Sequence, residues 1–131
     1  MKICIRLGII ILFLLTGLYA SKVDPIYNYV ESHLSKYRQT IHNDDISMKN
    51  GIIRLELNGR RTNIKSQFLL GFYSVGRALH WTNISCREIQ ITIHYEMKMG
   101  NQISARAPID KVMDLSQGRL STEQFFFLIG Y

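Results

Sequence analysis

Residues 46–58, ISMKNGIIRLELN, contain the clearest fold signal in the chain. Two runs of alternating apolar residues flank Asn50-Gly51, the dipeptide most typical of a two-residue hairpin turn, because both positions in that turn need a positive φ. A turn of this length pairs Met48 with Ile53 and Ile46 with Leu55. Both pairs are apolar and lie on one face, so the turn and the hydrophobic pattern predict the same register.

A second hairpin is predicted for residues 88–107. From Glu88 to Met99 apolar and polar residues alternate strictly, which indicates a strand with one buried face. Residues 102–107 continue the alternation with smaller apolar side chains. A three-residue bulged turn at residues 99–101 keeps the apolar residues on one face. This turn places Met97 opposite Ile103 and Tyr95 opposite Ala105.

Helix signals precede and follow the two hairpins. Asp24-Pro25 is typical of a helix start, and apolar residues recur after it at helical spacing. A short helix is predicted for residues 108–118. Ser121 and Gln124 then form a capping box, which favours a last helix over a strand for residues 125–129. We expect this helix to bring residues 125–127 into the core; the alternative is that they form an interface.

The segment between the hairpins is the most apolar helix. It begins after residues 62–63, and its apolar stripe, which Leu69-Leu70 broadens, predicts the central packing element. Gly71 and Gly76 each cost about 1 kcal/mol against alanine inside a helix. We therefore expect both glycines to permit close approach to the sheet. Trp81, near the helix end, is expected to bury much of its ring.

Together these elements predict an α+β fold in the order α-β-β-α-β-β-α(-α). The most economical arrangement is one four-stranded antiparallel sheet, made of the two hairpins, with the helices packed on one face. The opposite face then carries the polar side chains of the alternating strands. The pattern indicates a single domain without internal repeats.

The first twenty residues differ sharply from the rest. Lys2 and Arg6 precede an almost wholly aliphatic run, and Ala20 ends the apolar stretch with a small residue. This pattern is typical of a secretory signal peptide. The alternative is an uncleaved membrane anchor, although the run is short of the ~20 apolar residues that a span needs. We expect residues 1–20 to export one domain, residues 21–131, to an extracytoplasmic location, periplasmic or secreted.

Charge and cysteine content narrow the classes of function. The formal net charge is +6, and a basic balance favours anionic partners, although a scattered excess also suits an ordinary soluble surface. Cys4 lies in the export segment, so Cys86 is alone in the exported domain and no internal disulfide is expected. Cys86 is either a small buried residue or a partner in an intermolecular disulfide.

The strongest candidate for a ligand site is the basic turn before the second helix. Arg60, Arg61 and Lys65 gather there, and backbone amides, the helix dipole and guanidinium groups together suit an anion. The hypothesis predicts a phosphate- or sulfate-bearing ligand. The alternative is a solvated turn whose long side chains reach neighbouring carboxylates such as Glu56.

The polar sheet face is the second candidate, as a surface for a protein partner. Its candidate residues are Arg54, Thr92, His94, Glu96 and Arg106. The predicted register makes His94 a cross-strand neighbour of Arg106, with Glu96 opposite Ser104. Cross-strand pairing alone explains such residue types, so the face is equally typical of a solvated antiparallel sheet.

The four histidines, at positions 33, 42, 80 and 94, lack the spacing of metal ligands. We expect no metal, no cofactor and no catalytic residues, and we do not expect nucleic acid as a partner. The leading interpretation is a non-catalytic extracytoplasmic domain that binds an envelope or extracellular protein or contributes to an assembly. A module for an anionic ligand or a membrane surface is the alternative. A small secreted hydrolase acting on phosphodiesters is the third.

Overall fold

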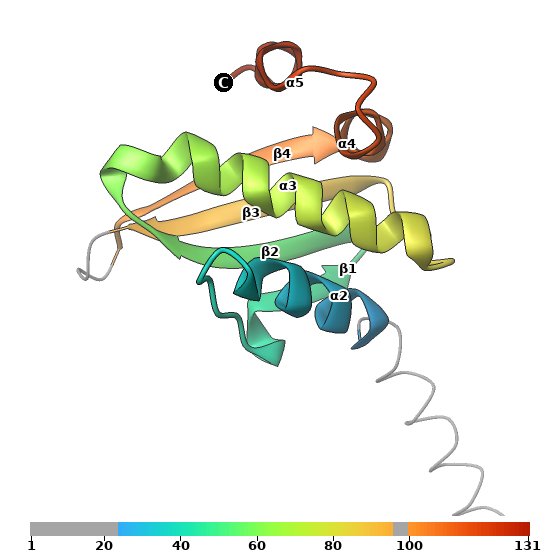
Figure 1. Cartoon of the computed structure of the whole chain (residues 1–131), viewed down its shortest axis with the longest axis horizontal. Helices are drawn as coiled ribbons and strands as arrows, with labels where there is room; N and C mark the ends of the chain where they lie inside the picture. Colours follow the sequence, from blue (N-terminus) through green and yellow to red (C-terminus); the bar gives the residue numbers. More distant parts are fainter. Residues whose placement is uncertain (1–23, 96–99) are drawn as a thin grey trace, which may run out of the picture.

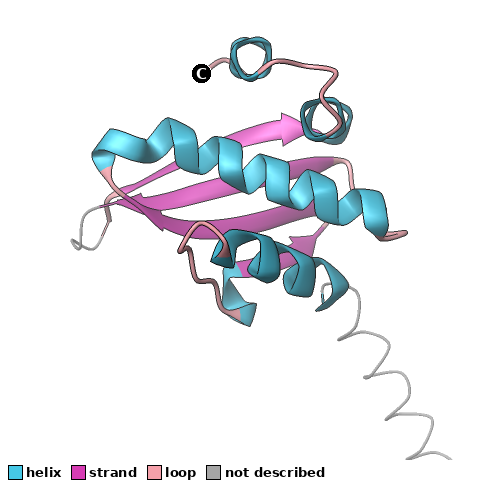
Figure 2. Ribbon diagram, in the orientation of Figure 1, coloured by secondary structure: helices cyan, strands magenta, loops and turns pink. Residues whose placement is uncertain are grey.

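A four-stranded sheet with helices on one face forms the framework of the protein (Figures 1 and 2). The computed structural model describes residues 24–95 and 100–131, so the predicted signal peptide, residues 1–20, lies outside the described residues. The helices are α2 (Asp24–Ser35), α3 (Ile64–Trp81), α4 (Ile109–Ser116) and α5 (Thr122–Leu128), and the strands are β1 (Ile46–Lys49), β2 (Ile52–Gly59), β3 (Glu88–Tyr95) and β4 (Gln102–Pro108). Two short 3-10 helices, η1 (Asn43–Asp45) and η2 (Arg61–Asn63), are added to the predicted succession. The fold is α+β.

The first hairpin has the predicted turn and the predicted register. β1 and β2 pair Met48 with Ile53 and Ile46 with Leu55. The turn residues Asn50 and Gly51 have φ values of 54° and 75°, as a two-residue turn between twisted strands requires. Local turn chemistry and hydrophobic alternation favour the same pairing here, which is why the sequence alone predicted the register of this hairpin.

The prediction of a fully antiparallel sheet was wrong, because β2 and β3 run parallel. The reason lies in the helix that connects them. The 18 residues of α3 span about 27 Å, and the eight residues of β2 span about 26 Å. The helix therefore returns the chain to the end of the sheet at which β2 began, and the next strand runs in the same direction. The sheet is mixed, in the order β1-β2-β3-β4.

The second hairpin keeps the predicted face but not the predicted register. β3 and β4 pair Ile93 with Ile103 and Ile91 with Ala105. The predicted partners of Ile103 and Ala105 were Met97 and Tyr95, each four residues further along the chain than the observed partner. Met97 lies outside the described residues. An even shift leaves every apolar side chain on the same face, so hydrophobic alternation cannot distinguish the two registers.

α3 is the central packing element, as predicted. It crosses the middle of the sheet, with α2 on the side of β1 and with α4 and α5 on the side of β4 (Figure 1). Its buried apolar residues Phe68, Phe72, Val75 and Leu79 belong to the core. A Cβ at Gly71 would lie 3.1 Å from Ile91 and 3.2 Å from Leu57. This glycine therefore permits close approach of the helix to the sheet.

Two predictions about the second half of α3 were wrong. A Cβ at Gly76 would lie 2.9 Å from the Cβ of Ser116, so this glycine permits the approach of α4 rather than of the sheet. Trp81 is 67% exposed, because the end of α3 extends past the strands (Figure 1). Among the described residues, no helix is both long and apolar enough to cross a membrane.

The C-terminal helix closes one side of the core. The predicted capping box forms, because the Gln124 amide donates to Ser121 Oγ at 3.2 Å and the Ser121 amide donates to Gln124 Oε1 at 3.0 Å. Phe125 and Phe126 are buried, whereas Phe127 is 84% exposed. The expectation that residues 125–127 complete the core therefore holds for the first two only.

Candidate functional site

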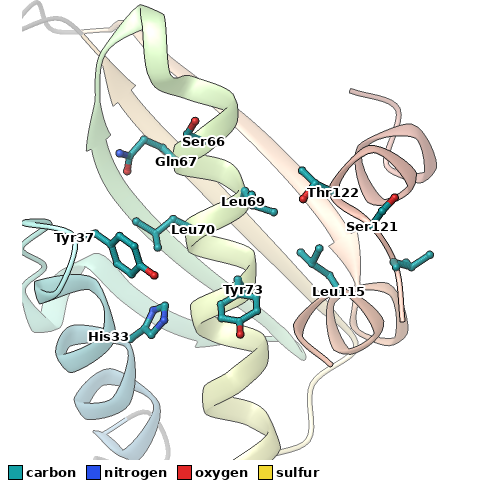
Figure 3. A pocket seen from close by; sticks show the side chains of 11 residues that line it. His33, Tyr37, Ser66, Gln67, Leu69, Leu70, Tyr73, Leu115, Ser121 and Thr122 are labelled. Carbon is teal, nitrogen blue, oxygen red and sulfur yellow. The ribbon is translucent and has the colours of Figure 1, made fainter. Parts of the chain in front are cut away.

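A trough of about 800 Å³ follows the outward side of α3. Figure 3 shows α3 as its floor, with His33 of α2 and the following Tyr37 on one side and side chains of α4 and the start of α5 on the other. The floor consists of Leu69, Leu70 and Tyr73, flanked toward the start of the helix by Ser66 and Gln67. We call this feature the α3 trough.

The floor of the α3 trough is apolar where a surface helix is ordinarily polar. Leu69 and Leu70 were expected to widen the buried stripe of this helix. They pack against the edge of the core but remain partly exposed, and they line the trough. A helix that is apolar on both sides usually has both sides covered.

An aromatic cluster lies where the α2 wall of the trough meets its floor. The His33 ring lies between three tyrosines, with centroid distances of 6.3 Å to Tyr29, 5.5 Å to Tyr37 and 5.7 Å to Tyr73. A hydrogen bond of 2.6 Å joins His33 Nδ1 and the hydroxyl of Ser74. The wall therefore presents flat aromatic surfaces to whatever enters the trough.

Burial and charge favour the neutral form of His33. Partial burial is the main cause that lowers the pKa of His33 below its usual 6.5, and the positive charges of Lys36 and Arg77 lower it further. A neutral imidazole packs among tyrosine rings without the cost of burying a charge. Lys36 and Arg77 also make this end of the trough basic.

One polar atom at the trough lacks a partner. The Oε1 atom of Gln67 is buried, and within the described part of the chain it accepts no hydrogen bond. An unsatisfied buried acceptor costs roughly 1–3 kcal/mol. Because the atom is buried, an occupant of the trough reaches it only after the neighbouring side chains move.

The pairing of a serine with a histidine does not make the trough a hydrolase site. Ser74 has no exposed surface, whereas a nucleophile must reach its substrate. The pKa of the Cys86 thiol is raised, mainly by burial, which disfavours the reactive thiolate. The described residues also contain no cluster of three or more histidine, cysteine or acidic side chains suited to a metal ion.

The residues of the predicted anion site lie on one turn, but their side chains diverge. The guanidinium of Arg61 lies 5.9 Å from the centre of the Tyr95 ring, and the Lys65 ammonium lies 5.0 Å from the centre of the Phe126 ring. Arg60 is exposed, and its backbone amide donates to Asn63 Oδ1 at 2.7 Å. Cation–π contacts of this kind stabilise the fold. The anion site stays a prediction.

The predicted binding face of the sheet is open and largely self-paired. Arg54 and Thr92 line a polar hollow of about 300 Å³. His94 pairs with Glu56 at 3.1 Å, and Arg106 donates to Gln90 at 3.1 Å. The predicted neighbours His94 and Arg106 are therefore not paired, since the register shift places His94 opposite Gln102 and Arg106 opposite Gln90.

The register shift between β3 and β4 also changes the partners of Thr92 and Ser104 on this face. Thr92 lies opposite Ser104, and their hydroxyls are 2.8 Å apart. Ser104 had been expected to face Glu96, which lies outside the described residues. Most of the polar groups on this face have a partner within the sheet, and its role in binding stays a prediction.

Sequence reasoning missed the α3 trough. The available signal was an excess of apolar residues on α3, since Leu69, Leu70 and Tyr73 extend its apolar surface beyond the stripe that one sheet can cover. No protein-family model matches the chain, and searches of curated proteins and of solved structures found no match. The geometry and chemistry of the trough are therefore the basis for a functional assignment.

Proposed function

We propose that this protein is a non-catalytic extracytoplasmic binding domain that holds an apolar segment of a protein partner in the α3 trough. The observation that carries the proposal is the apolar floor of Leu69, Leu70 and Tyr73 between two walls of side chains. Covering apolar surface is favourable in proportion to the area removed from water, and exposed apolar grooves mark interaction sites.

A polypeptide suits the trough better than a purely apolar ligand. Its apolar side chains would cover the leucines of the floor, and its backbone groups would pair with hydroxyl groups that line the trough. Tyr37 and Tyr73 offer both a flat apolar surface and a hydroxyl group, a combination enriched in protein interfaces. Binding of a partner segment in a groove between helices is a recurrent mode of recognition.

The chemistry of the trough supports binding rather than catalysis. The hydroxyl of Ser74 is occupied by His33 and has no exposed surface. His33 itself has a lowered pKa but, among the described side chains, no carboxylate partner within ion-pair distance. Its ring lies against tyrosine rings. A general base needs a group that orients it and a proton that it can reach.

The extracytoplasmic part of the proposal rests on residues 1–20. Their positive start, apolar middle and small residue at the exit are typical of an export signal. The proposal predicts that the cellular protein begins near residue 21 if the signal is cleaved. Mass spectrometry of the N-terminus from cells that express the full chain decides between cleavage and a retained anchor.

Site-specific photocrosslinking tests the binding function. A photoreactive amino acid replaces Leu69 in the full-length chain, and the control carries it at Ser104, an exposed position on the opposite sheet face. We expect one product of defined mass at position 69, with the crosslinked partner residues apolar by mass spectrometry, and no such product at position 104. The additional change Leu70→Asp should abolish the product at position 69.

Equal labelling at positions 69 and 104 would contradict the proposal, because it would show that partners contact the trough no more often than they contact the polar sheet face. Circular dichroism of the Leu70→Asp variant serves as the folding control. A product that persists in a folded Leu70→Asp variant would also contradict it.

A further inference from the structure

The outer side of α5 is an exposed apolar surface. Phe127 is 84% exposed and Leu128 is 50% exposed. With Leu120, Glu123 and Gln124 they line a shallow hollow of about 510 Å³, which we call the α5 patch. Large exposed apolar side chains gathered on one helix mark an interaction surface.

The α5 patch borders the α3 trough. Leu120 lines both of them, so the two surfaces are adjacent. A two-fold axis near their common boundary would bring the α5 patch of each copy onto the trough of the other. Such a contact is isologous and closes after two copies, so it does not propagate into a fibre.

The two surfaces match in polarity. The α5 patch presents two exposed apolar side chains, Phe127 and Leu128, and the trough offers an apolar floor. Its volume of about 800 Å³ lies within the range of pockets that enclose whole ligands, roughly 300–1,000 Å³. Both side chains therefore fit in the space available.

Charge follows the same match. Glu123 lies four residues before Phe127, on the same side of α5. Lys36 and Arg77 are close enough to His33, which lines the trough, to lower its pKa, so this end of the trough is basic.

From these matches we infer that the occupant of the α3 trough is the α5 patch of a second copy of this chain, so that the protein forms a two-fold symmetric dimer. The inference rests on the proposed function, because it names the partner that the trough accepts. Phe127 is the anchor of each contact, and Glu123 pairs with the basic end of the trough of the other copy, close to His33.

Disulfide trapping tests the contact directly. Two differently tagged full-length chains are co-expressed, both with Cys4 and Cys86 changed to Ala. One carries Leu69→Cys and the other carries Phe127→Cys. We expect a mixed disulfide between the two tags under mild oxidation. Replacing Phe127→Cys by Trp81→Cys, at a position that is also an exposed apolar residue, should give none.

Substitution of the anchor tests whether the contact holds the dimer. Truncation of a central aromatic anchor weakens an interface by roughly tenfold or more. In otherwise unchanged chains, Phe127→Ala should reduce co-purification of the two tags by about that factor, and Trp81→Ala should leave it unchanged. Phe127 is mostly exposed, so its truncation should not unfold the chain.

The outcomes separate this inference from the proposed function. If the tags do not co-purify, or if Phe127→Ala leaves their association unchanged, the dimer contact is wrong. A photocrosslink from position 69 to a different protein would then leave the proposed function standing. If position 69 captures neither a second copy nor another protein, both are wrong.

Discussion

At the scale of single residues, His33 is the position at which burial, charge and hydrogen bonding combine. Its ring lies among tyrosines and shares a hydrogen bond with the buried Ser74. Partial burial, with the charges of Lys36 and Arg77, lowers its pKa below 6.5. The fold therefore stabilises the neutral ring, and protonation opposes folding.

The sign of the pH dependence follows from this lowered pKa. The contribution of His33 to the free energy of unfolding is fully present above about pH 6.5 and is lost as the pH falls below that value, because the unfolded chain then binds a proton more tightly than the folded chain does. We expect His33→Gln to reduce the loss of stability on acidification from about pH 7.5 to 5.5. Urea unfolding at both pH values measures the difference. An NMR titration midpoint of His33 at or above 6.5 would contradict the prediction.

At the scale of elements, the contact between α3 and α4 depends on Gly76. A Cβ at this position would lie 2.9 Å from the Cβ of Ser116 and 3.1 Å from Val112 Cγ1. The two helices therefore approach as closely as a glycine permits. The contact also sets the position of Leu115, which lines the α3 trough.

We expect Gly76→Ala to lower the free energy of unfolding. Overpacking costs roughly 1–3 kcal/mol, which outweighs the roughly 1 kcal/mol that alanine gains in helix propensity. Ser66→Ala, at an exposed position on the same helix, is the control and should change stability by less than about 0.5 kcal/mol. Adding Ser116→Gly should recover part of the loss. Thermal unfolding of the four proteins measures these effects, and a stabilised Gly76→Ala variant would contradict them.

At the scale of the whole molecule, the last helix belongs to the core although it lies at the end of the chain. The Phe125 ring has no exposed surface, and its centroid lies 5.2 Å from that of Phe72 on α3. Phe126 is also buried. The same helix therefore completes the core on one side and exposes the α5 patch on the other.

This division predicts opposite effects for neighbouring phenylalanines. Phe125→Ala should lower the free energy of unfolding by roughly 3–5 kcal/mol, since it leaves a cavity in the core. Phe127→Ala should change it by less than about 0.5 kcal/mol when measured by urea unfolding at a concentration at which the protein is monomeric. Similar losses for both variants would show that the assignment of the two faces of α5 is wrong.

Features that depend on near neighbours in the chain were predictable. The turn at Asn50-Gly51, the capping box of Ser121 and the packing role of Gly71 were all predicted from a few adjacent residues and a periodicity. The reason is that φ preferences, cap hydrogen bonds and the 2.0 and 3.6 periods act within one element. The anion site at residues 60–65 was local too, but local sequence could not show that Arg61 and Lys65 lie over different aromatic rings.

The sequence by itself therefore determined which described segments form the α-helices and strands, and which face of each is apolar. Only the tertiary structure decided the parallel pairing of β2 with β3, the four-residue shift that pairs Ile103 with Ile93 instead of Met97, and the exposure of Leu69 in a trough. Periodicity specifies that an apolar face must be covered, but not by what. The covering depends on where the chain returns after each element, and that is a property of the whole fold.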